Sequence, residues 1–442
     1  MDEWYRTTLG DLCAVGICEL QTGPFGSQLH AHDYLPDGVA VVPTEAIRAR
    51  RIDHSVLPRI AEEKATSLAR HRLQSGDILF ARRGVQATGH IGVIREAESG
   101  FICGTGAIRL RVESRNDKIN TEFLSHLLAD PAAIEWFKFH AIGATMPNLN
   151  EGIIRSFSVL LPPLREQREI ARVLSALDDK IDLNRRMNET LEAMARALFK
   201  DWFVDFGPTR AKQEGMEPYL APDLWSLFPE RLDVEGKPEG WQAFLLEHIA
   251  EHCKGTVCPS DRPDNLFEHY SLPAFDKGQN PAMDLGQTIK SNKTPVPKGA
   301  VLLSKLNPEI PRVWLPDDLT DTPQIASTEF LVFLPKAPSG RATLYCLFRD
   351  AGFKRMLEGM VTGTSKSHQR ISPPALLKRR VLCGSNSALA ALESVLAPAL
   401  SRLRSNRAES RTLAQTRDLL LPKLMSGEIR VEDAEKTMEA HL

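Results

Sequence analysis

The chain has 442 residues, of which 42% are hydrophobic and 25% are charged, and its net charge is −2. This length exceeds one ordinary hydrophobic core, and the composition excludes a fibrous or generally disordered protein, so two or three globular domains are expected. The near-neutral charge disfavours a protein that simply coats DNA, because such binding depends on neutralising many phosphates.

The N-terminal residues are acidic and aromatic, and no basic stretch followed by an apolar run is present, which disfavours a secretory signal. No uninterrupted apolar segment approaches the roughly 20 residues of a membrane-spanning helix. Seven unevenly spaced cysteines form no close framework and favour reduced thiols. We therefore expect a cytoplasmic protein without membrane contacts.

The first globular segment, residues 1–162, contains short apolar runs separated by Gly, Pro, Asn and Asp. Runs such as 39–42 and 90–94 are typical of short strands joined by long loops. A helix is predicted over 120–128. The pattern therefore favours an α+β fold.

The next segment, residues 163–206, is predicted to form one long helix. It follows Pro162-Pro163, and neither Gly nor Pro occurs between 164 and 203. Its apolar residues recur at intervals close to seven, which is typical of a coiled coil. Asn184 interrupts the apolar stripe, and a buried Asn at such a position would fix the register of the helix against its partner. An exposed Asn at the edge of the helix is the alternative.

The second half of the chain follows the same order. Residues 207–240 are rich in Pro, Glu and Gly and are predicted to be a connector, with a short helix around 224–228. A second globular segment covers 241–384. A second long helix is predicted over 385–426, followed by a tail at 427–442. Pro398 should kink this helix or delay its start, and Arg402 and Glu409 fall in its stripe.

The two halves are repeats of each other. Ile170 and Leu198 correspond to Leu392 and Leu420 at one offset (392 − 170 = 222 and 420 − 198 = 222), and Asn184 corresponds to Asn406. Residues 75–82 match 298–305 at an offset of 223, and Trp4 starts the first repeat as Trp241 starts the second. The stripe of each long helix needs a partner, so we expect the two helices to pair antiparallel.

The sequence resembles specificity subunits of type I restriction-modification systems in several places. Residues 159–170, continuing through 177–181, are similar to the first helical spacer of that family. Residues 200–206 resemble the end of this spacer, and residues 419–429 resemble the C-terminal segment of the family. The strand motifs at 76–82 and 299–305 are similar to the corresponding strand of the two target-recognition domains. The proline-rich entry is absent before the second helix, so the resemblance does not fix where that helix begins.

Together with the repeat, the resemblance implies an α+β fold with a pseudo-twofold internal repeat. Two similar target-recognition domains, at 1–162 and 241–384, would be separated by two long antiparallel coiled-coil helices. The resemblance also implies a chain without catalysis of its own, which binds double-stranded DNA and two methyltransferase subunits. Those subunits would methylate adenine with S-adenosylmethionine. Motor-nuclease subunits would join for translocation and cleavage with ATP and Mg²⁺, and no cofactor is expected in this chain.

The predicted helices have a suitable length for a spacer. A helix of about 40 residues is roughly 60 Å long at about 1.5 Å per residue, whereas one turn of DNA is about 34–36 Å. Two half-sites would thus lie one to two turns apart. Because the two globular segments differ strongly in sequence, we expect a two-part, non-palindromic target.

Candidate DNA contacts come from polar loops next to the predicted strands. Bases are recognised chiefly by Arg, Lys, Asn and Gln, while hydroxyls and backbone amides hold phosphates. In the first segment the candidates are Thr22, Gly23, Phe25, Ser27, Gln28, Arg82, Arg83, Gln86, Thr145 and Asn148. In the second segment they are Lys305, Asn307, Ser365, Lys366, His368 and Arg370. A plain tight turn at 22–28 and a solvated loop tip at 82–83 are the alternatives.

Other polar clusters lack the spacing of a catalytic or metal site. These clusters are His30, His32 and Asp33; His248, His252, Cys253 and Cys258; and Asp53 with Glu62, Glu63 and Lys64. None has paired CxxC or HExxH spacing, so we expect no metal. The chain also lacks a GxxxxGK[ST] motif and an Asn/Asp-Pro-Pro-aromatic run, which disfavours ATP hydrolysis and adenine methylation. Two alternatives stay open: a self-contained DNA methyltransferase or nuclease with duplicated recognition domains, and a coiled-coil adaptor that binds only protein.

Overall fold

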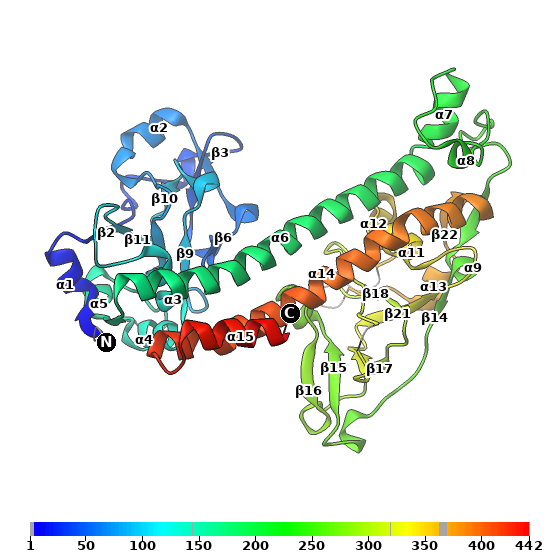
Figure 1. The fold of residues 1–442 in the computed structure, drawn as a ribbon. Coiled ribbons are helices and arrows are strands. Elements are labelled where there is room, and N and C mark those ends of the chain that lie inside the picture. The colour runs from blue at the N-terminus through cyan, green and yellow to red at the C-terminus, as the bar shows by residue number, and fades with distance from the viewer. Residues whose placement is uncertain (1–3, 144, 319, 362–368, 442) are drawn as a thin grey trace. The chain divides into compact units, whose positions relative to one another are not determined.

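The computed structural model describes residues 4–143, 145–318, 320–361 and 369–441. They divide into two compact units, a first unit of residues 1–181 and 412–442 and a second unit of residues 182–411. Each unit contains part of the helix α6 (Leu164–Phe203) and part of the helix α14 (Asn386–Ser426) (Figure 1). Among the described helices, none could cross a membrane.

The first unit contains an antiparallel four-stranded sheet in the order β2-β11-β8-β9, a mixed sheet β10-β4-β7-β3 and the pairs β1-β12 and β5-β6. Its strands are β1 (Tyr5–Thr8), β2 (Cys18–Thr22), β3 (Tyr34–Leu35), β4 (Val39–Val42), β5 (Ile47–Arg48), β6 (Arg51–Ile52), β7 (Arg59–Ile60), β8 (Ile78–Ala81), β9 (Ile91–Val93), β10 (Ile102–Cys103), β11 (Ala107–Val112) and β12 (Ser158–Leu161). Its short helices are α1 (Leu9–Ala14), α2 (Glu62–Ser67), α3 (Thr121–Ala129), α4 (Pro131–His140), α5 (Glu151–Ser156) and α15 (Val431–His441).

The second unit contains an antiparallel sheet in the order β14-β21-β18-β19, a mixed sheet β16-β15-β20-β17 and the pair β13-β22. Its strands are β13 (Gln242–Leu245), β14 (Ala250–His252), β15 (Leu266–Tyr270), β16 (Ala282–Leu285), β17 (Thr294–Pro295), β18 (Val301–Ser304), β19 (Val313–Trp314), β20 (Gln324–Ala326), β21 (Phe330–Pro335) and β22 (Arg380–Gly384). Its short helices are α7 (Gly207–Gln213), α8 (Pro222–Trp225), α9 (Leu246–Ile249), α10 (Leu272–Asp276), α11 (Arg341–Phe348), α12 (Ala351–Glu358) and α13 (Pro373–Leu377).

The two units share the strand order of their antiparallel sheet and of one two-stranded pair. The order β2-β11-β8-β9 corresponds position by position to β14-β21-β18-β19, and β1-β12 corresponds to β13-β22. Their starting residues keep the offset found in the sequence, since 301 − 78 = 223 for β18 and β8 and 386 − 164 = 222 for α14 and α6. The predicted α+β class and internal repeat are therefore confirmed.

Both long helices belong to the hydrophobic cores of the units. In the first unit, Ile170 and Leu174 of α6 and Leu420 of α14 share one core with the β2-β11-β8-β9 sheet. In the second unit, Trp202 of α6 and Leu392 of α14 share a core with the equivalent sheet. Burial of these apolar stripes, and not helix propensity alone, stabilises the long helices.

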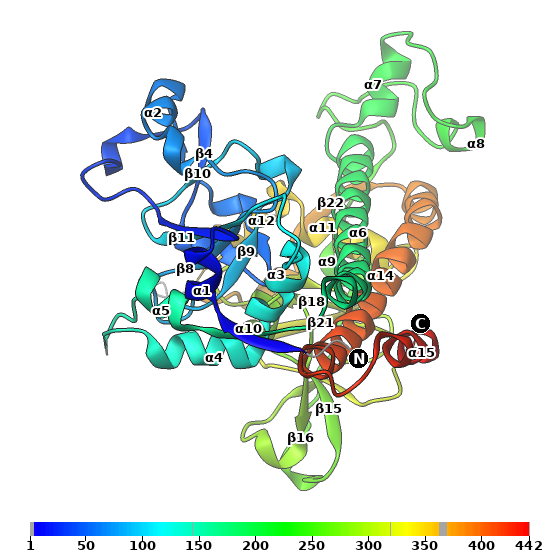
Figure 2. The same cartoon turned by 60° about the vertical axis from the view of Figure 1, so that its left-hand side comes forward.

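Within the second unit, α6 and α14 run antiparallel, as predicted. The amide nitrogen of Asn184 donates to Oε2 of Glu409 at 2.9 Å, and the amide nitrogen of Asn406 donates to Oδ1 of Asn188, also at 2.9 Å. Residue numbers thus rise along one helix as they fall along the other. Figure 2 shows the two helices side by side from a second direction.

The second long helix starts at Asn386, one residue after the predicted 385, so Pro398 lies inside it and does not delay its start. The start is fixed by Ser385, whose hydroxyl accepts the N–H of Ala388 at 3.2 Å, as a capping residue does. Buried Leu396 and Leu400 hold the turns around Pro398 in the core. Arg402 is exposed, so its predicted place in the stripe is wrong.

The connector and the tail contain helices that were not predicted from the sequence. The segment 427–442 contains α15, whose Ala434 is fully buried, and Arg430 next to it donates to Oε1 of Glu166 at 2.9 Å. The connector contains α7, with Ala211 buried at the equivalent position (434 − 211 = 223). The short helix predicted around 224–228 is α8, which begins earlier, at Pro222.

The two asparagines of the stripe give a stability prediction. Asn184 and Asn406 are fully buried, and the amide oxygen of each has no hydrogen-bond partner in the described part of the chain. An unsatisfied buried acceptor costs stability. We expect Asn406→Leu to raise the free energy of unfolding by about 1 kcal/mol. Because the register would lose a polar constraint, hydrogen exchange along 184–192 should become faster. A lower free energy of unfolding would contradict the stability prediction. Unchanged hydrogen exchange along 184–192 would contradict the register role of Asn406.

His71 makes the first unit sensitive to acid. Its side chain is buried, both ring nitrogens lack hydrogen-bond partners among the described residues, and burial, aided by Arg70 and Arg109, lowers its pKa to about 4. The unfolded chain takes up this proton near pH 6.5, so stability falls as the pH drops from there towards 4. At pH 5 the loss should be about 2 kcal/mol. His71→Leu should flatten this part of a stability–pH curve measured by urea unfolding. An unchanged slope would mean that other groups cause the acid sensitivity.

Candidate nucleic-acid interface

Three of the predicted loops meet at one edge of the sheet β2-β11-β8-β9. In this antiparallel sheet Thr22 pairs with Ile108 and Ala81 pairs with Ala107, so the ends of β2 and β8 lie next to the start of β11. The loops at 22–28 and 82–89 leave the sheet there. The segment 142–150 joins them through its backbone pairing of Asn148 with Arg83. We call these three segments the first edge.

Hydrogen bonds hold the first edge together. The backbone N–H and the hydroxyl of Thr22 donate to Oε1 of Glu151 at 3.0 and 2.8 Å. Nε of Arg82 donates to Oδ1 of Asn148 at 2.9 Å and to the carbonyl oxygen of Leu149 at 3.0 Å. Thr22, Arg82 and Asn148 are therefore brought together, and their polar groups are occupied in shaping the edge.

Several side chains of the first edge remain available to a ligand. The exposed candidates are Phe25, Ser27, Gln28, Arg83, Gln86 and Thr145. Of these, Gln28 already accepts the N–H of Phe25 at its Oε1 at 3.0 Å, which leaves its amide nitrogen. The guanidinium of Arg83 has no hydrogen bond or ion pair with any residue that the structure describes. An exposed, unpaired guanidinium on an anchored backbone suits bidentate contact with a phosphate or a guanine.

Gly23 has a structural role at this edge. A side-chain carbon placed on Gly23 would lie 2.0 Å from the carbonyl oxygen of Gly104, so the backbone of the loop can approach the start of β11 only at a glycine. The N–H of Gly23 also donates to the carbonyl oxygen of Ala107 at 2.9 Å. Gly23 therefore positions the loop 22–28.

The second unit repeats this construction at its equivalent sheet edge. The backbone of Leu306 pairs with Arg370, as Arg83 pairs with Asn148 in the first unit (306 − 83 = 223 and 370 − 148 = 222). The N–H of Asn307 donates to the carbonyl oxygen of Gln369 at 3.2 Å. We call Lys254, 305–307 and 369–371 the second edge.

The candidates of the second edge have different surroundings. Both nitrogens Nε and Nη2 of Arg370 donate to the carboxylate of Glu329 at 3.1 Å, so its charge already has a protein partner. Asn307 has a positive φ of 49°, which this residue type tolerates in a turn. The predicted Ser365, Lys366 and His368 lie outside the described residues.

Cations lie near one histidine in each unit. Burial lowers the pKa of His90 in the first unit, with further contributions from Lys138 and Arg48. Burial also lowers the pKa of His252 in the second unit, with contributions from Lys254 and Lys305. Two histidines, one in each unit, thus experience nearby cations, and in the second unit these are Lys254 and Lys305 of the second edge.

An apolar group beside the first edge was not predicted from the sequence. Phe139, Ile142 and Met146 are exposed by 86%, 62% and 65%, and the backbone of Ile142 pairs with Asn148. Phe139 lies off the buried stripe of α4, whose Ala133 and Phe137 point into the core. An aromatic residue off the apolar stripe of a helix is the signal in the sequence that could have indicated this exposed apolar group.

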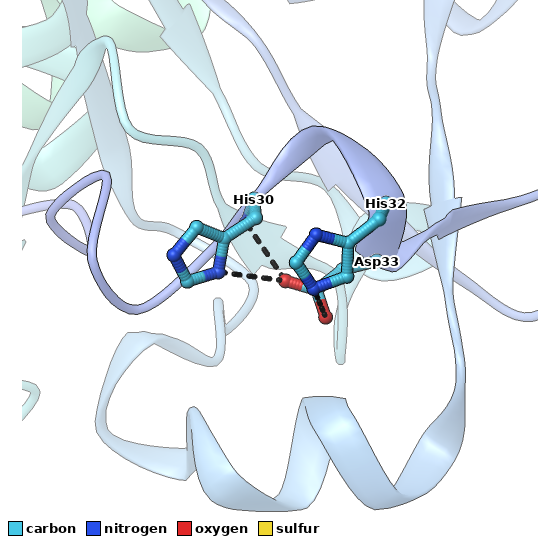
Figure 3. Close-up of side chains that lie close together, drawn as sticks. All are labelled: His30, His32 and Asp33. Carbon is cyan, nitrogen blue, oxygen red and sulfur yellow. Dashed lines mark hydrogen bonds and ion pairs between the residues drawn. The ribbon is translucent and has the colours of Figure 1, made fainter.

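His30, His32 and Asp33 lie close together in and beside a 3₁₀ turn (Figure 3). The imidazole rings of the two histidines are stacked, with centroids 5.0 Å apart. The carboxylate of Asp33 accepts the N–H of His30 at 2.7 Å and contacts Nζ of Lys64 at 3.0 Å. Both contacts lower the pKa of Asp33, and the hydrogen bond from the backbone of His30 contributes most. A cation would have to compete with the Lys64 ammonium for this carboxylate.

Comparison with known proteins finds relatives that match most of the chain. Residues 52–193 match the family model of the type I restriction modification DNA specificity domain. The type I restriction enzyme HindI specificity subunit of Haemophilus influenzae is 23% identical over 82% of this chain and 88% of its own length. The MjaIX specificity subunit of Methanocaldococcus jannaschii is 25% identical over 72% of this chain and 71% of its own length. In fold, the chain is similar to the crystal structure of a type I restriction-modification S subunit from M. genitalium, with a TM-score of 0.57 at 14% identity over 96% of each chain.

Proposed function

We propose that this chain is a type I restriction-modification specificity subunit and selects the DNA sequence on which such an enzyme acts. The observation that carries this proposal is the repetition of one loop arrangement in both units, in which Arg83 pairs with Asn148 and Leu306 pairs with Arg370. Each edge also holds an exposed cation, Arg83 in the first and Lys254 in the second, together with polar side chains, which is the chemistry that DNA requires.

The two edges should bind different half-sites. At equivalent positions the first unit has Asn148 held by Arg82, whereas the second has Arg370 held by Glu329. Different donors and acceptors select different bases in the major groove. We therefore infer a two-part, non-palindromic target. The lengths of α6 and α14, 40 and 41 residues, support a spacer role for these helices.

We further propose that chemistry is supplied by other subunits. Two methyltransferase subunits, using S-adenosylmethionine, would bind this chain, and motor-nuclease subunits would add ATP- and Mg²⁺-dependent cleavage in the cytoplasm. Incubating the purified chain with DNA and radiolabelled S-adenosylmethionine tests the non-catalytic part. Methyl transfer by this chain alone would favour a self-contained methyltransferase instead.

Mapping methylated adenines in the host genome tests the recognition function. Deleting the gene should remove methylation from one two-part motif and leave other motifs unchanged. Retention of every motif would contradict the proposal.

Arg83 gives a residue-level prediction for DNA binding. Arg83→Ala should weaken binding to duplex DNA and reduce the slope of log affinity against log salt by about 1, because one phosphate contact is lost. Arg115→Ala is the matched control, since Arg115 is also exposed but lies beyond the opposite end of β11. Equal slopes for the two variants in a salt titration would remove Arg83 from the interface.

A further inference from the structure

Two cysteines of the first unit lie in direct contact, and the proposed function does not use them. Cys13 is in α1 and Cys18 begins β2, and their Sγ atoms are 3.1 Å apart. A disulfide bond has an S–S distance of about 2.0 Å. An approach of about 1 Å would therefore join the two sulfurs, which is within the reach of side-chain rotation.

The backbone between the two cysteines holds them at this distance. The N–H of Gly16 donates to the carbonyl oxygen of Cys13 at 3.1 Å, and the N–H of Ile17 donates to that of Leu12 at 3.0 Å. Gly16 has a φ of +77°, which closes the turn. Leu12 and Ile17 are buried. The turn is thus anchored on both sides, and α1 also packs against α5 (Figure 2).

The two thiols differ in access and in ionisation. Cys18 is 4% exposed, whereas Cys13 is only partly buried. The hydrogen bond from Cys18 lowers the pKa of Cys13 to about 7, and Arg155 of α5 assists, against burial and the charges of Glu151 and Glu19. The same hydrogen bond and burial raise the pKa of Cys18. Cys13 therefore supplies the thiolate, which is the nucleophilic form.

We propose that Cys13 and Cys18 form an oxidation site that hydrogen peroxide converts into an intramolecular disulfide. The thiolate of Cys13 attacks one peroxide oxygen, the O–O bond breaks, and hydroxide leaves, so that Cys13 becomes a sulfenic acid. The sulfur of Cys18 then attacks the sulfur of Cys13, an S–S bond forms, and water leaves with the thiol proton of Cys18. Two thiols are oxidised by two electrons and one peroxide is reduced to two waters.

This disulfide would link α1 covalently to the base of β2. The same strand ends at Thr22, where the loop 22–28 of the first edge begins. The site therefore lies one strand length away from the candidate interface, in the same sheet.

The test uses the purified full chain, treated with a small excess of hydrogen peroxide and then denatured. Titratable thiols should fall from seven to five, since two cysteines pair (7 − 2 = 5), and the intact mass should fall by that of two hydrogen atoms. Peptide mapping should show Cys13 linked to Cys18. Cys13→Ser and Cys18→Ala should each abolish the loss of two thiols.

Cys258→Ser is the control, because Cys258 is also partly buried but its Sγ contacts the hydroxyl of Ser260, 3.1 Å away. The peroxide-dependent loss of two thiols should persist in this variant. Retention of all seven thiols, a sulfinic acid at Cys13 or a disulfide between two chains would overturn the proposal. If Cys18→Ala does not fold, the peptide map of the peroxide-treated wild-type chain decides whether Cys13 is linked to Cys18.

Discussion

Asp178→Ala should lower the free energy of unfolding of the first unit by about 3 kcal/mol, because it removes one carboxylate partner from each of two half-buried arginines. Asp178 of α6 is 6% exposed. Its Oδ1 accepts from Nη1 of Arg417 of α14 at 2.7 Å, and its Oδ2 accepts from Nη1 of Arg50. Burial lowers the pKa of Arg50, and the charge of Asp178 opposes that shift. Each guanidinium also pairs with a second carboxylate, Glu122 for Arg50 and Asp418 for Arg417, so Asp178 is one of two partners for each arginine.

Asp179→Ala provides the control for this prediction. Asp179 is the next residue of α6 and is exposed, so its removal should change stability by no more than about 0.5 kcal/mol. Urea unfolding, followed by hydrogen exchange in peptides of residues 4–181, measures both variants. Equal losses would show that the contacts of Asp178 contribute little. A second variant, Asp178→Asn, retains hydrogen bonding without the charge and should fall between the two.

The repeat and the long helices could be predicted from the sequence because both depend on local periodicity. The constant offset of 222 residues and the seven-residue pattern can be recognised without knowledge of any distant contact. Pro398 misled the prediction, because a missing backbone donor normally weakens a helix interior. Packing of Leu396 and Leu400 in the second core outweighs that loss. Arg402 was misplaced because the spacing of the stripe changes around the proline.

The candidate interface could be predicted only in part. Its loops were found from their composition, but their assembly depends on contacts between distant residues. Arg82 and Asn148 are 66 residues apart, and they meet where the backbone of Arg83 pairs with that of Asn148. No local pattern contains that pairing. For the same reason, the ion pair of Arg370 with Glu329, 41 residues away, was not foreseen.

The helices α7 and α15 were missed for a related reason. Both follow the ends of the long helices and are short, polar segments whose periodic pattern is brief. A helix of this length is marginal on its own and depends on tertiary packing. Buried Ala211 and Ala434 provide that packing. Continuing the 223-residue offset past the long helices would have indicated the second helix from the first.

Gly23→Val should disrupt the first edge and leave the second unit intact. The Cβ atom of the valine would be forced against the carbonyl oxygen of Gly104. Because this oxygen belongs to the backbone and cannot rotate away, the end of β2 must separate from the start of β11. Overpacking of this kind costs about 1–3 kcal/mol. The displaced loop would also carry Phe25 and Gln28 out of position. We therefore expect affinity for the two-part DNA target to fall by about tenfold or more, since each well-placed base contact contributes about 1–3 kcal/mol.

Gly26→Val separates this effect from a general intolerance of the loop. Gly26 lies three residues further on and is exposed, and a side-chain carbon placed on it would meet no atom within 4 Å. Its substitution should leave thermal stability unchanged within about 0.5 kcal/mol. Binding titrations and melting curves of the two variants give the answer. If both lose target affinity equally while both stay stable, the loop contacts DNA through its backbone along its whole length, and the close approach of Gly23 to Gly104 is not what positions it.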